Sequence, residues 1–472
     1  MKSKYLYLQT IGCQMNVYDS EQIAMQLAAI GYQQTAMLDD ADLIIVNTCT
    51  VRAKAEQKAF SFIGRLAKLK RHKKGLMIGV AGCVAQQEGQ RILERMPAVD
   101  LVFGTQALDR LPFLIKRIET RHCRIVDVDM METPDIPDSL VGSQKSSEVS
   151  KFVTIMRGCD NYCAYCVVPF VRGRETSRQP ESIIGEIKAL VDNGVKEVIL
   201  LGQNVNSYGK NQNLCSFAEL LAMINKIEGL LRIRFTTSHP KDLGTDLISG
   251  FRDINKLCSH IHLPVQSGSN RILRRMNRNY TREQYLDKVA ELRDTCPQIA
   301  ITSDIIVGFP GETETDFDRT LQLVETVEFD GLFAFQYSDR PPAPAVQLPD
   351  KISTSIISHR LQVVLAFQDQ LTRSKNQQLV GSTQMVLTDG FSKKEAAGSP
   401  NGSDSPLQWT GRTSTNKIVN FYVDASTANK LNLTGKMVGV HIDKGCSHSL
   451  SGKATNLEPS LRGLKGAENY AA

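Results

Sequence analysis

Long apolar segments are absent from this chain of 472 residues: no hydrophobic run approaches the roughly 20 residues needed to span a bilayer. The N-terminus, Met1 to Leu6, also lacks the apolar core and small-residue cleavage site of a secretory leader. These absences predict a cytoplasmic protein with no membrane partner. In a reducing compartment, the 11 cysteines are better suited to metal binding or to packing as thiols than to disulfide bonds.

Composition places few limits on function. Hydrophobic residues make up 42% of the chain and charged residues 22%, as in ordinary globular proteins, and the length suggests roughly three domains. The net charge of +6 permits an acidic partner without requiring one. Two segments are locally basic, Arg65 to Lys74 and Arg271 to Arg282. Each could be a solvated helix face or a nucleic-acid contact.

Residues 1–125 alternate strand-like and helical patterns, which predicts an open parallel sheet with helices on its faces. The expected strands are 4–10, 41–47 and 75–81, and the expected helices are 20–30, 53–71 and 86–95. One cysteine follows each strand: Cys13, Cys49 and Cys83. Because ligand sites of such sheets lie at the carboxyl ends of strands, we expect these thiols at one edge. Three unrelated buried cysteines would also fit the pattern.

Three further cysteines, Cys159, Cys163 and Cys166, lie within eight positions directly after a strand-like run. Their spacing is too tight for a disulfide framework, and the second Cys/His pair of a structural zinc site is missing. Thiolates are preferred ligands of iron–sulfur clusters, and three of them can hold only three irons of a four-iron cube. The stretch therefore predicts a cluster with one iron open to a substrate-like ligand.

Residues 151–375 repeat a strand-then-helix unit six times, which predicts a partial (β/α)6 barrel with its chemistry at the carboxyl ends of the strands. The expected strands are 151–157, 196–201, 231–236, 259–265, 299–307 and 331–337. Gln203 and Asn204 follow the second strand and Arg340 follows the sixth, so they are predicted cofactor or substrate contacts. Each could equally belong to ordinary loop chemistry.

The remaining segments are two connections and a third domain. Residues 126–150 are acidic and then rich in Pro and Ser, which predicts a linker. Residues 376–455 alternate as strands do and predict a small antiparallel β-barrel. An insertion at 391–406 is expected to form a loop within it, and 456–472 form a polar tail.

The cysteine stretch on the first strand of a six-unit barrel resembles the radical S-adenosylmethionine (SAM) superfamily. The preceding domain, with Cys13, Cys49 and Cys83, is similar to that of methylthiotransferases, and the C-terminal unit is similar to a TRAM domain, an RNA-binding β-barrel. This resemblance implies SAM and two 4Fe-4S clusters as cofactors. Cys13, Cys49 and Cys83 would hold one cluster, and Cys159, Cys163 and Cys166 the catalytic one. Gln203, Asn204 and Arg340 would contact SAM or substrate.

Three stretches, 12–16, 47–52 and 166–175, resemble the branch of this family that acts on isopentenylated tRNA. The resemblance implies methylthiolation of C2 of N6-isopentenyladenosine at position 37, with SAM as methyl donor and as radical source. Implied partners are the tRNA anticodon loop, an unidentified electron donor and an unidentified sulfur source, and the enzyme is expected to be a monomer. Two departures from the family pattern are Pro341-Pro342-Ala343, in place of Pro-Gly-Thr after Arg340, and the insertion at 391–406.

Two alternatives stay open. The first is a sister enzyme that methylthiolates a ribosomal protein side chain or threonylcarbamoyladenosine in tRNA, and the residues around Cys13 and Cys49 argue against it by resemblance. The second is a non-catalytic RNA-binding protein with structural iron–sulfur clusters. The unfilled ligand position after Cys166 argues against that.

Overall fold

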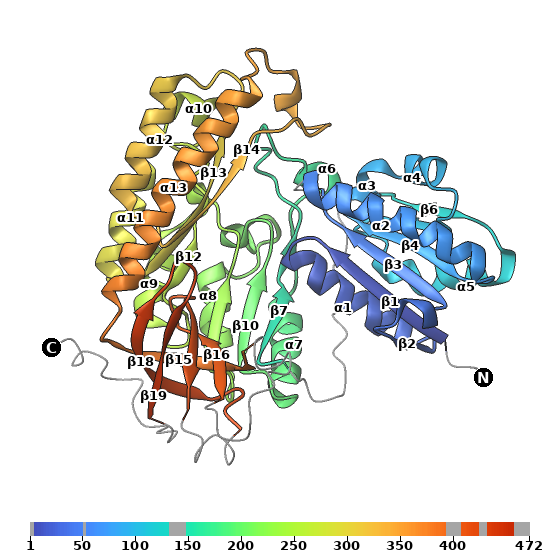
Figure 1. Cartoon of the computed structure of the whole chain (residues 1–472), viewed down its shortest axis with the longest axis horizontal. Helices are drawn as coiled ribbons and strands as arrows, with labels where there is room; N and C mark the ends of the chain where they lie inside the picture. The colour runs from blue at the N-terminus through green and yellow to red at the C-terminus, as the bar shows by residue number, and fades with distance from the viewer. Residues whose placement is uncertain (1–3, 51–52, 132–147, 393–406, 424–431, 457–472) are drawn as a thin grey trace.

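Three structural units follow one another along the chain (Figure 1). The computed structural model describes residues 4–50, 53–131, 148–392, 407–423 and 432–456. Most of the predicted linker and of the predicted insertion, and nearly all of the predicted tail, lie outside these residues. Within them, no helix combines the length and the apolar character needed to cross a membrane.

The N-terminal unit is a six-stranded sheet, parallel throughout, in the order β2-β1-β3-β4-β5-β6. Its strands are β1 (Lys4–Ile11), β2 (Tyr32–Gln34), β3 (Leu43–Thr48), β4 (Met77–Gly82), β5 (Leu101–Phe103) and β6 (Ile125–Asp127). All six residues of β3 are buried, as expected for a central parallel strand. The predicted open parallel sheet is confirmed, and β6 extends it two residues beyond the predicted boundary at 125.

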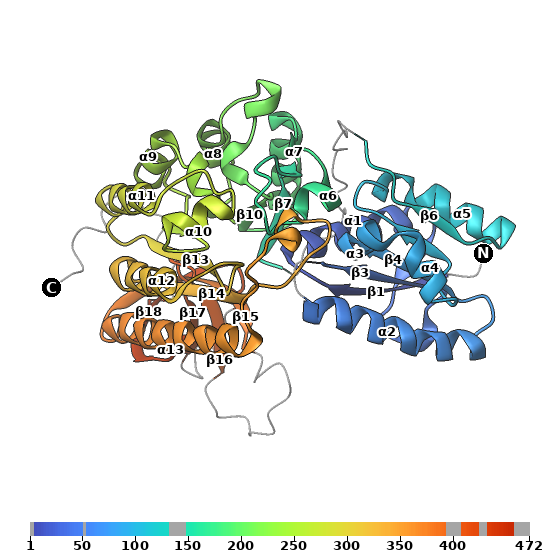
Figure 2. The same ribbon diagram turned by 90° about the horizontal axis from the view of Figure 1, so that it is seen from above.

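Helices cover both faces of this sheet (Figure 2). They are α1 (Gln14–Ala28), α2 (Ala53–His72), α3 (Cys83–Glu88), α4 (Gln90–Arg95) and α5 (Leu111–Arg121). α1 and α5 pack on one face, and α2, α3 and α4 on the other. The first helix begins at Gln14, not at residue 20, so it starts directly after Cys13. The helix predicted at 86–95 is split by Gly89, whose φ of +47° interrupts it.

Six parallel strands form the central unit and confirm the predicted partial barrel. They are β7 (Ser150–Thr154), β10 (Glu197–Leu201), β11 (Arg232–Phe235), β12 (His260–His262), β13 (Ala300–Val307) and β14 (Gly331–Gln336). A parallel bridge between Ile233 and Leu257 joins the two three-stranded halves. The first predicted strand is interrupted: β7 ends at Thr154, and the short β8 (Met156–Arg157) pairs antiparallel with β9 (Thr176–Ser177).

The barrel helices lie outside the strands (Figure 2). They are α7 (Pro180–Asp192), α8 (Phe217–Asn225), α9 (Thr245–Asp253), α11 (Arg282–Thr295), α12 (Glu314–Val327) and α13 (Thr354–Gln378), with the short α6 (Val168–Arg172) and α10 (Asn270–Arg275) near the strand ends. Reciprocal capping hydrogen bonds fix the starts of α8, α11 and α12. The N-terminal and central units are in contact here: Met15 and Tyr18 of α1 pack against Leu201 of β10.

A closed barrel of five strands forms the C-terminal unit, in the order β15-β16-β17-β19-β18. Its strands are β15 (Thr383–Phe391), β16 (Gln408–Arg412), β17 (Ile418–Tyr422), β18 (Met437–Gly445) and β19 (Leu450–Asn456). Four of its five pairings are antiparallel, as predicted, but β17 and β19 are parallel. The single tryptophan of the chain, Trp409, is 2% exposed in its core.

Buried arginines of β11 attach this small barrel to the amino end of the central one. Arg234 Nε pairs with Glu197 Oε2 at 3.0 Å, and its Nη1 donates to the carbonyl of Ser414 at 3.0 Å. Arg232 Nη2 donates to the carbonyl of Met385, also at 3.0 Å. Glu197 further accepts from Ser150 Oγ at 3.0 Å. Guanidinium groups of the central unit thus donate hydrogen bonds to backbone carbonyls of the C-terminal barrel.

We predict that Arg234→Met lowers stability by about 3 kcal/mol, because Glu197 of the central unit is left buried without its cation. The carbonyls of Thr413 and Ser414 in the C-terminal barrel also lose their donor. Denaturant unfolding followed by the fluorescence of Trp409 measures this unit selectively. Arg252→Met is the control, since Arg252 forms an exposed pair with Asp253 and its loss should leave the midpoint almost unchanged. Equal midpoints for the two variants would contradict a stabilising role for Arg234.

Candidate functional site

Cys13, Cys49 and Cys83 follow β1, β3 and β4 directly, and the strand register brings them to one edge of the sheet. Ile11 lies opposite Thr48, and Thr48 lies opposite Gly82. The chain passes from β1 to β2 on one side and to β3 on the other, so Cys13 and Cys49 flank the topological switch point, where open sheets bind ligands. A hydrogen bond with Cys49, helped by the charge of Arg172, lowers the pKa of Cys13 to about 6.

Two buried asparagines hold this edge together: they lie in the stretches 12–16 and 47–52, but the sequence predicted no role for either. Asn16 Oδ1 accepts from the backbone N–H of Cys13 at 3.2 Å and from its Sγ at 3.3 Å. Asn16 Nδ2 donates to Asn47 Oδ1 at 2.9 Å, and Asn47 Nδ2 returns a bond to the Asn16 carbonyl at 2.9 Å. A Cβ on Gly82, whose φ is +89°, would lie 2.3 Å from the Thr48 carbonyl oxygen. Glycine is therefore required immediately before Cys83.

Each sulfur of the second set accepts a hydrogen bond. The donors are Asn161 Nδ2 to Cys159 at 3.5 Å, Arg278 Nη1 to Cys163 at 3.3 Å and the N–H of Val168 to Cys166 at 3.4 Å. Burial raises the pKa of Cys159 to about 11 and that of Cys166 to about 12. Ionised sulfur at these positions requires a positive partner, and bound iron is one. The residues thus fit an iron–sulfur cluster.

The basic segment that contains Arg278 was open to two interpretations, and part of it lies inside the protein. Arg278 is 4% exposed and also donates to the carbonyl of Pro264 at 2.7 Å. The same segment supplies α10, where Arg271 pairs with Asp316. Two cations of this segment therefore bind other parts of the protein: Arg278 bonds to the cysteine loop and Arg271 to the barrel.

The three predicted SAM or substrate contacts all have protein partners. Gln203 Oε1 accepts from the N–H of Gly158 at 2.6 Å, next to Cys159. Asn204 Nδ2 donates to Asp242 Oδ2 at 2.8 Å. Arg340 Nη1 donates to the carbonyl of Thr50 at 2.8 Å, next to Cys49. Their contacts with SAM stay predictions, whereas the bonds of Gln203 and Arg340 beside Cys159 and Cys49 are features of the structure.

Three other residues at the ends of β10 and β11 carry buried polar atoms that lack a hydrogen-bond partner in the described part of the chain: Asn206, Ser238 and His239. The N–H of Lys241 donates to His239 Nδ1 at 3.2 Å, so the proton of the neutral ring lies on Nε2. Burial, with the nearby cations Arg278 and Lys241, lowers the pKa of His239 to about 2. Unpaired buried polar atoms are costly, so this group is suited to a polar ligand.

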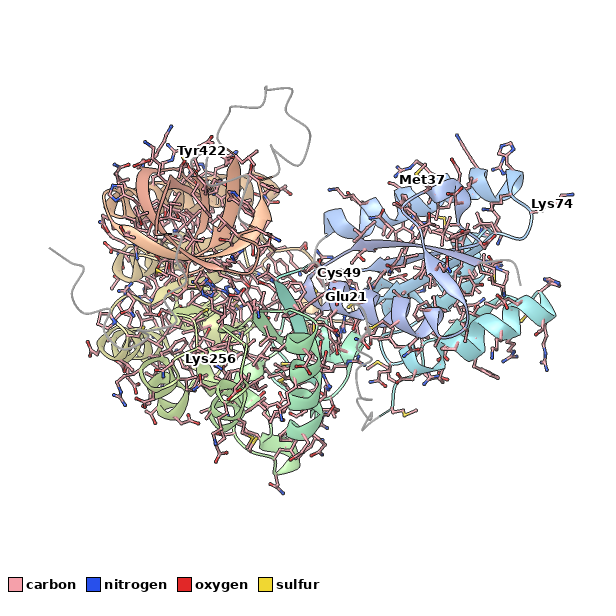
Figure 3. The ribbon with its side chains drawn as sticks, turned by 90° about the horizontal axis from the view of Figure 1, so that it is seen from below. Glu21, Met37, Cys49, Lys74, Lys256 and Tyr422 are labelled. Carbon is pink, nitrogen blue, oxygen red and sulfur yellow. The ribbon has the colours of Figure 1, made fainter. Side chains whose placement is uncertain are left out.

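Cys49 and Glu21 lie where the N-terminal unit meets the barrel (Figure 3). Cys83 packs in one cluster with Val167 and Val171 of the barrel loop, and the hydroxyl of Thr105 donates to the Val171 carbonyl at 2.7 Å. Lys151 of β7 pairs with Glu21 at 2.9 Å beside this junction. No three His, Cys, Asp or Glu side chains in the described ranges converge closely enough for a single metal ion. A four-iron cluster is wider than one ion, and the two ligand sets stay predictions.

Two family models match the chain. Residues 5–104 match an uncharacterised protein family, UPF0004, and residues 153–324 match the radical SAM superfamily. Among solved structures, a radical SAM methyltransferase, TsrM, from Kitasatospora setae has a TM-score of 0.54 at 13% identity, covering 73% of this chain and 77% of that one. The cobalamin-dependent SAM radical enzyme OxsB has a TM-score of 0.51 at 12% identity, covering 78% and 56%. At such identities these two structures support the fold alone.

Sequence relatives are much closer and extend over nearly the whole chain. A tRNA-2-methylthio-N(6)-dimethylallyladenosine synthase from Desulfosudis oleivorans is 52% identical, covering 96% of this chain and 97% of its own. Proteins with the same name from Syntrophus aciditrophicus and Geobacter metallireducens are each 50% identical, with 96% and 95% of this chain and 95% and 98% of theirs covered. The chain therefore belongs to the tRNA-2-methylthio-N(6)-dimethylallyladenosine synthase family of radical SAM enzymes.

Proposed function

We propose that this protein is a radical SAM tRNA methylthiotransferase that modifies C2 of N6-isopentenyladenosine at position 37. The observation that carries the proposal, in a chain of this family, is the packing of Cys83 of one cysteine set with Val167, the residue after Cys166 of the other. Cys159, Cys163 and Cys166 would hold the catalytic 4Fe-4S cluster and Cys13, Cys49 and Cys83 the second. When bound, SAM and the clusters supply methyl transfer, a sulfur-binding iron and one-electron chemistry. One-electron chemistry is required because no base can ionise the aromatic C–H bond.

Residues of the chain orient and enclose these groups. Asn161, Arg278 and the Val168 N–H donate to the three sulfurs of the catalytic set and would favour their ionised form. Lys241 Nζ holds Asn161 through its Oδ1 at 2.6 Å. The ring of His239 lies 5.7 Å from that of Tyr280, which accepts from Arg278. Its Nε2–H has no partner within the described ranges and can donate to a carboxylate or hydroxyl of SAM or substrate. Burial of this group excludes water from the reacting face.

The RNA partner would be the anticodon loop, whose bases can be splayed out toward the barrel mouth. In the C-terminal barrel, Phe391 and Tyr422 are 48% and 40% exposed, and aromatic rings of this kind stack with bases. The exposed cations Arg65, Lys68 and Arg71 of α2 would add salt-dependent attraction to phosphates. The electron donor and sulfur source are unidentified, and the monomeric state and cytoplasmic location stay predictions.

We predict a gain of a methylthio group on isopentenyladenosine when tRNA carrying that base is incubated anaerobically with reconstituted protein, SAM and a reductant. Mass spectrometry of the digested nucleosides measures the product. Cys163→Ala should abolish it, and Cys123→Ala, which removes a thiol at the opposite edge of the N-terminal sheet, should not. Modification of threonylcarbamoyladenosine or of a ribosomal protein instead would favour the sister activity.

Iron analysis tests the two ligand sets separately. We expect about eight irons per chain after anaerobic reconstitution, as two four-iron cubes require. Replacing Cys13, Cys49 and Cys83 together by Ala should leave about four, whereas Cys123→Ala should leave about eight. A parent protein that binds about four irons, and still binds four after the triple replacement, would rule out the second cluster.

A further inference from the structure

Arg172 is a buried cation that the barrel extends into the N-terminal domain. It ends α6, a single short turn that begins two residues after Cys166. Its side chain is 3% exposed, and its Nη2 donates to Asp19 Oδ2 of α1 at 2.8 Å. Because α6 is so short, only five residues separate Cys166 of the catalytic set from Arg172, which enters the domain of the other set.

The position of Arg172 relative to the N-terminal cysteines distinguishes it from an ordinary interdomain ion pair. Its partner Asp19 lies in α1, the helix whose N-cap residue is Cys13. Cys83 is also in van der Waals contact with Val167 and Val171, so the α6 segment closes over it.

Part of the Arg172–Asp19 pair is unsatisfied. Arg172 Nη1 and Asp19 Oδ1 are buried, and neither has a hydrogen-bond partner among the residues that the structure describes. A pair kept only for packing would be expected to use these atoms, since a buried ion pair stabilises a protein only when its remaining donors and acceptors are bonded. The spare N–H instead is available to sulfur or to an anion bound at the cysteines.

We propose that Arg172 is a positioning residue of the N-terminal cluster: it balances the negative charge of the Cys13, Cys49 and Cys83 thiolates and, opposed by Asp19, sets the reduction potential of the cluster. This inference rests on the two-cluster function proposed above. The N-terminal domain would then supply all three sulfur ligands, while the barrel supplies the compensating charge. Reduction adds an electron, so a nearby cation favours the reduced form and a nearby carboxylate disfavours it.

The test uses the full chain with Cys159, Cys163 and Cys166 all replaced by Ala, so that a single cluster remains. Arg172→Gln and Asp19→Asn are compared with this parent by iron analysis and by a dithionite titration followed by electron paramagnetic resonance. Lys4→Gln is the matched control, because Lys4 is a cation at the far, amino end of β1, paired with Glu119. It removes the same charge at a distance from the cysteines.

We expect Arg172→Gln to disfavour reduction by at least about tenfold, a shift of about 59 mV to lower potential for one electron. Asp19→Asn should shift the potential in the opposite direction, Arg172→Lys should restore part of the loss, and Lys4→Gln should change nothing measurable. Potentials of Arg172→Gln and Asp19→Asn that both equal the parent's would overturn the proposal.

Other outcomes are equally decisive. If Arg172→Gln fails to retain iron, the Asp19→Asn titration decides alone, and an unshifted potential there overturns the role of the pair. A parent with no iron would overturn the second cluster itself, and with it the proposed function of the N-terminal cysteines. A parent that binds about four irons and shows no shift in either variant leaves the two-cluster function intact and removes only the role of Arg172.

Discussion

The site depends on one geometric constraint: parallel strands in a single sheet end at the same edge. The N-terminal sheet uses it to bring together Cys13, Cys49 and Cys83, which are separated by more than 30 residues at each step. The central barrel uses it again, placing the Cys159 loop, Asn206 and His239 at the ends of three successive strands. The two edges then meet because α6 and the segment after β14, which carries Arg340, both reach the N-terminal unit.

Buried polar groups at this junction are arranged in two ways. Asn16 and Asn47 exchange hydrogen bonds with each other and with the backbone, so they stiffen the edge that carries Cys13. Asn206, Ser238 and His239 have spare donors and acceptors, which cost stability unless a ligand pairs with them. The first group supports a scaffold that persists in the free protein, and the second is suited to bound SAM or substrate.

The sequence predicted those features that follow from local pattern. These features are the six barrel strands, the open sheet and the strand-end positions of both cysteine sets. They depend on the alternation of apolar and polar residues and on the spacing of cysteines, which neighbouring residues determine. The start of α1 was wrong because Gln14 to Asp19 have no helical apolar period, and tertiary contacts of Asn16 hold them in a helix. The parallel pairing of β17 with β19 was missed for a related reason, since strand direction in a closed barrel depends on long-range order. Arg172 lies in the stretch 166–175 that carries the family resemblance, but no role was predicted for it, because the sequence does not show which domain its side chain enters.

A partial barrel, unlike a closed one, leaves two strand edges unpaired, here β7 and β14. Exposed edges of this kind present free backbone donors and acceptors and are common starting points for aggregation. In this protein, α1 of the N-terminal domain contacts β7, and α13 lies along β14. The domain that carries the second cysteine set therefore also shields a strand edge of the barrel, so loss of that domain would expose a surface prone to self-association.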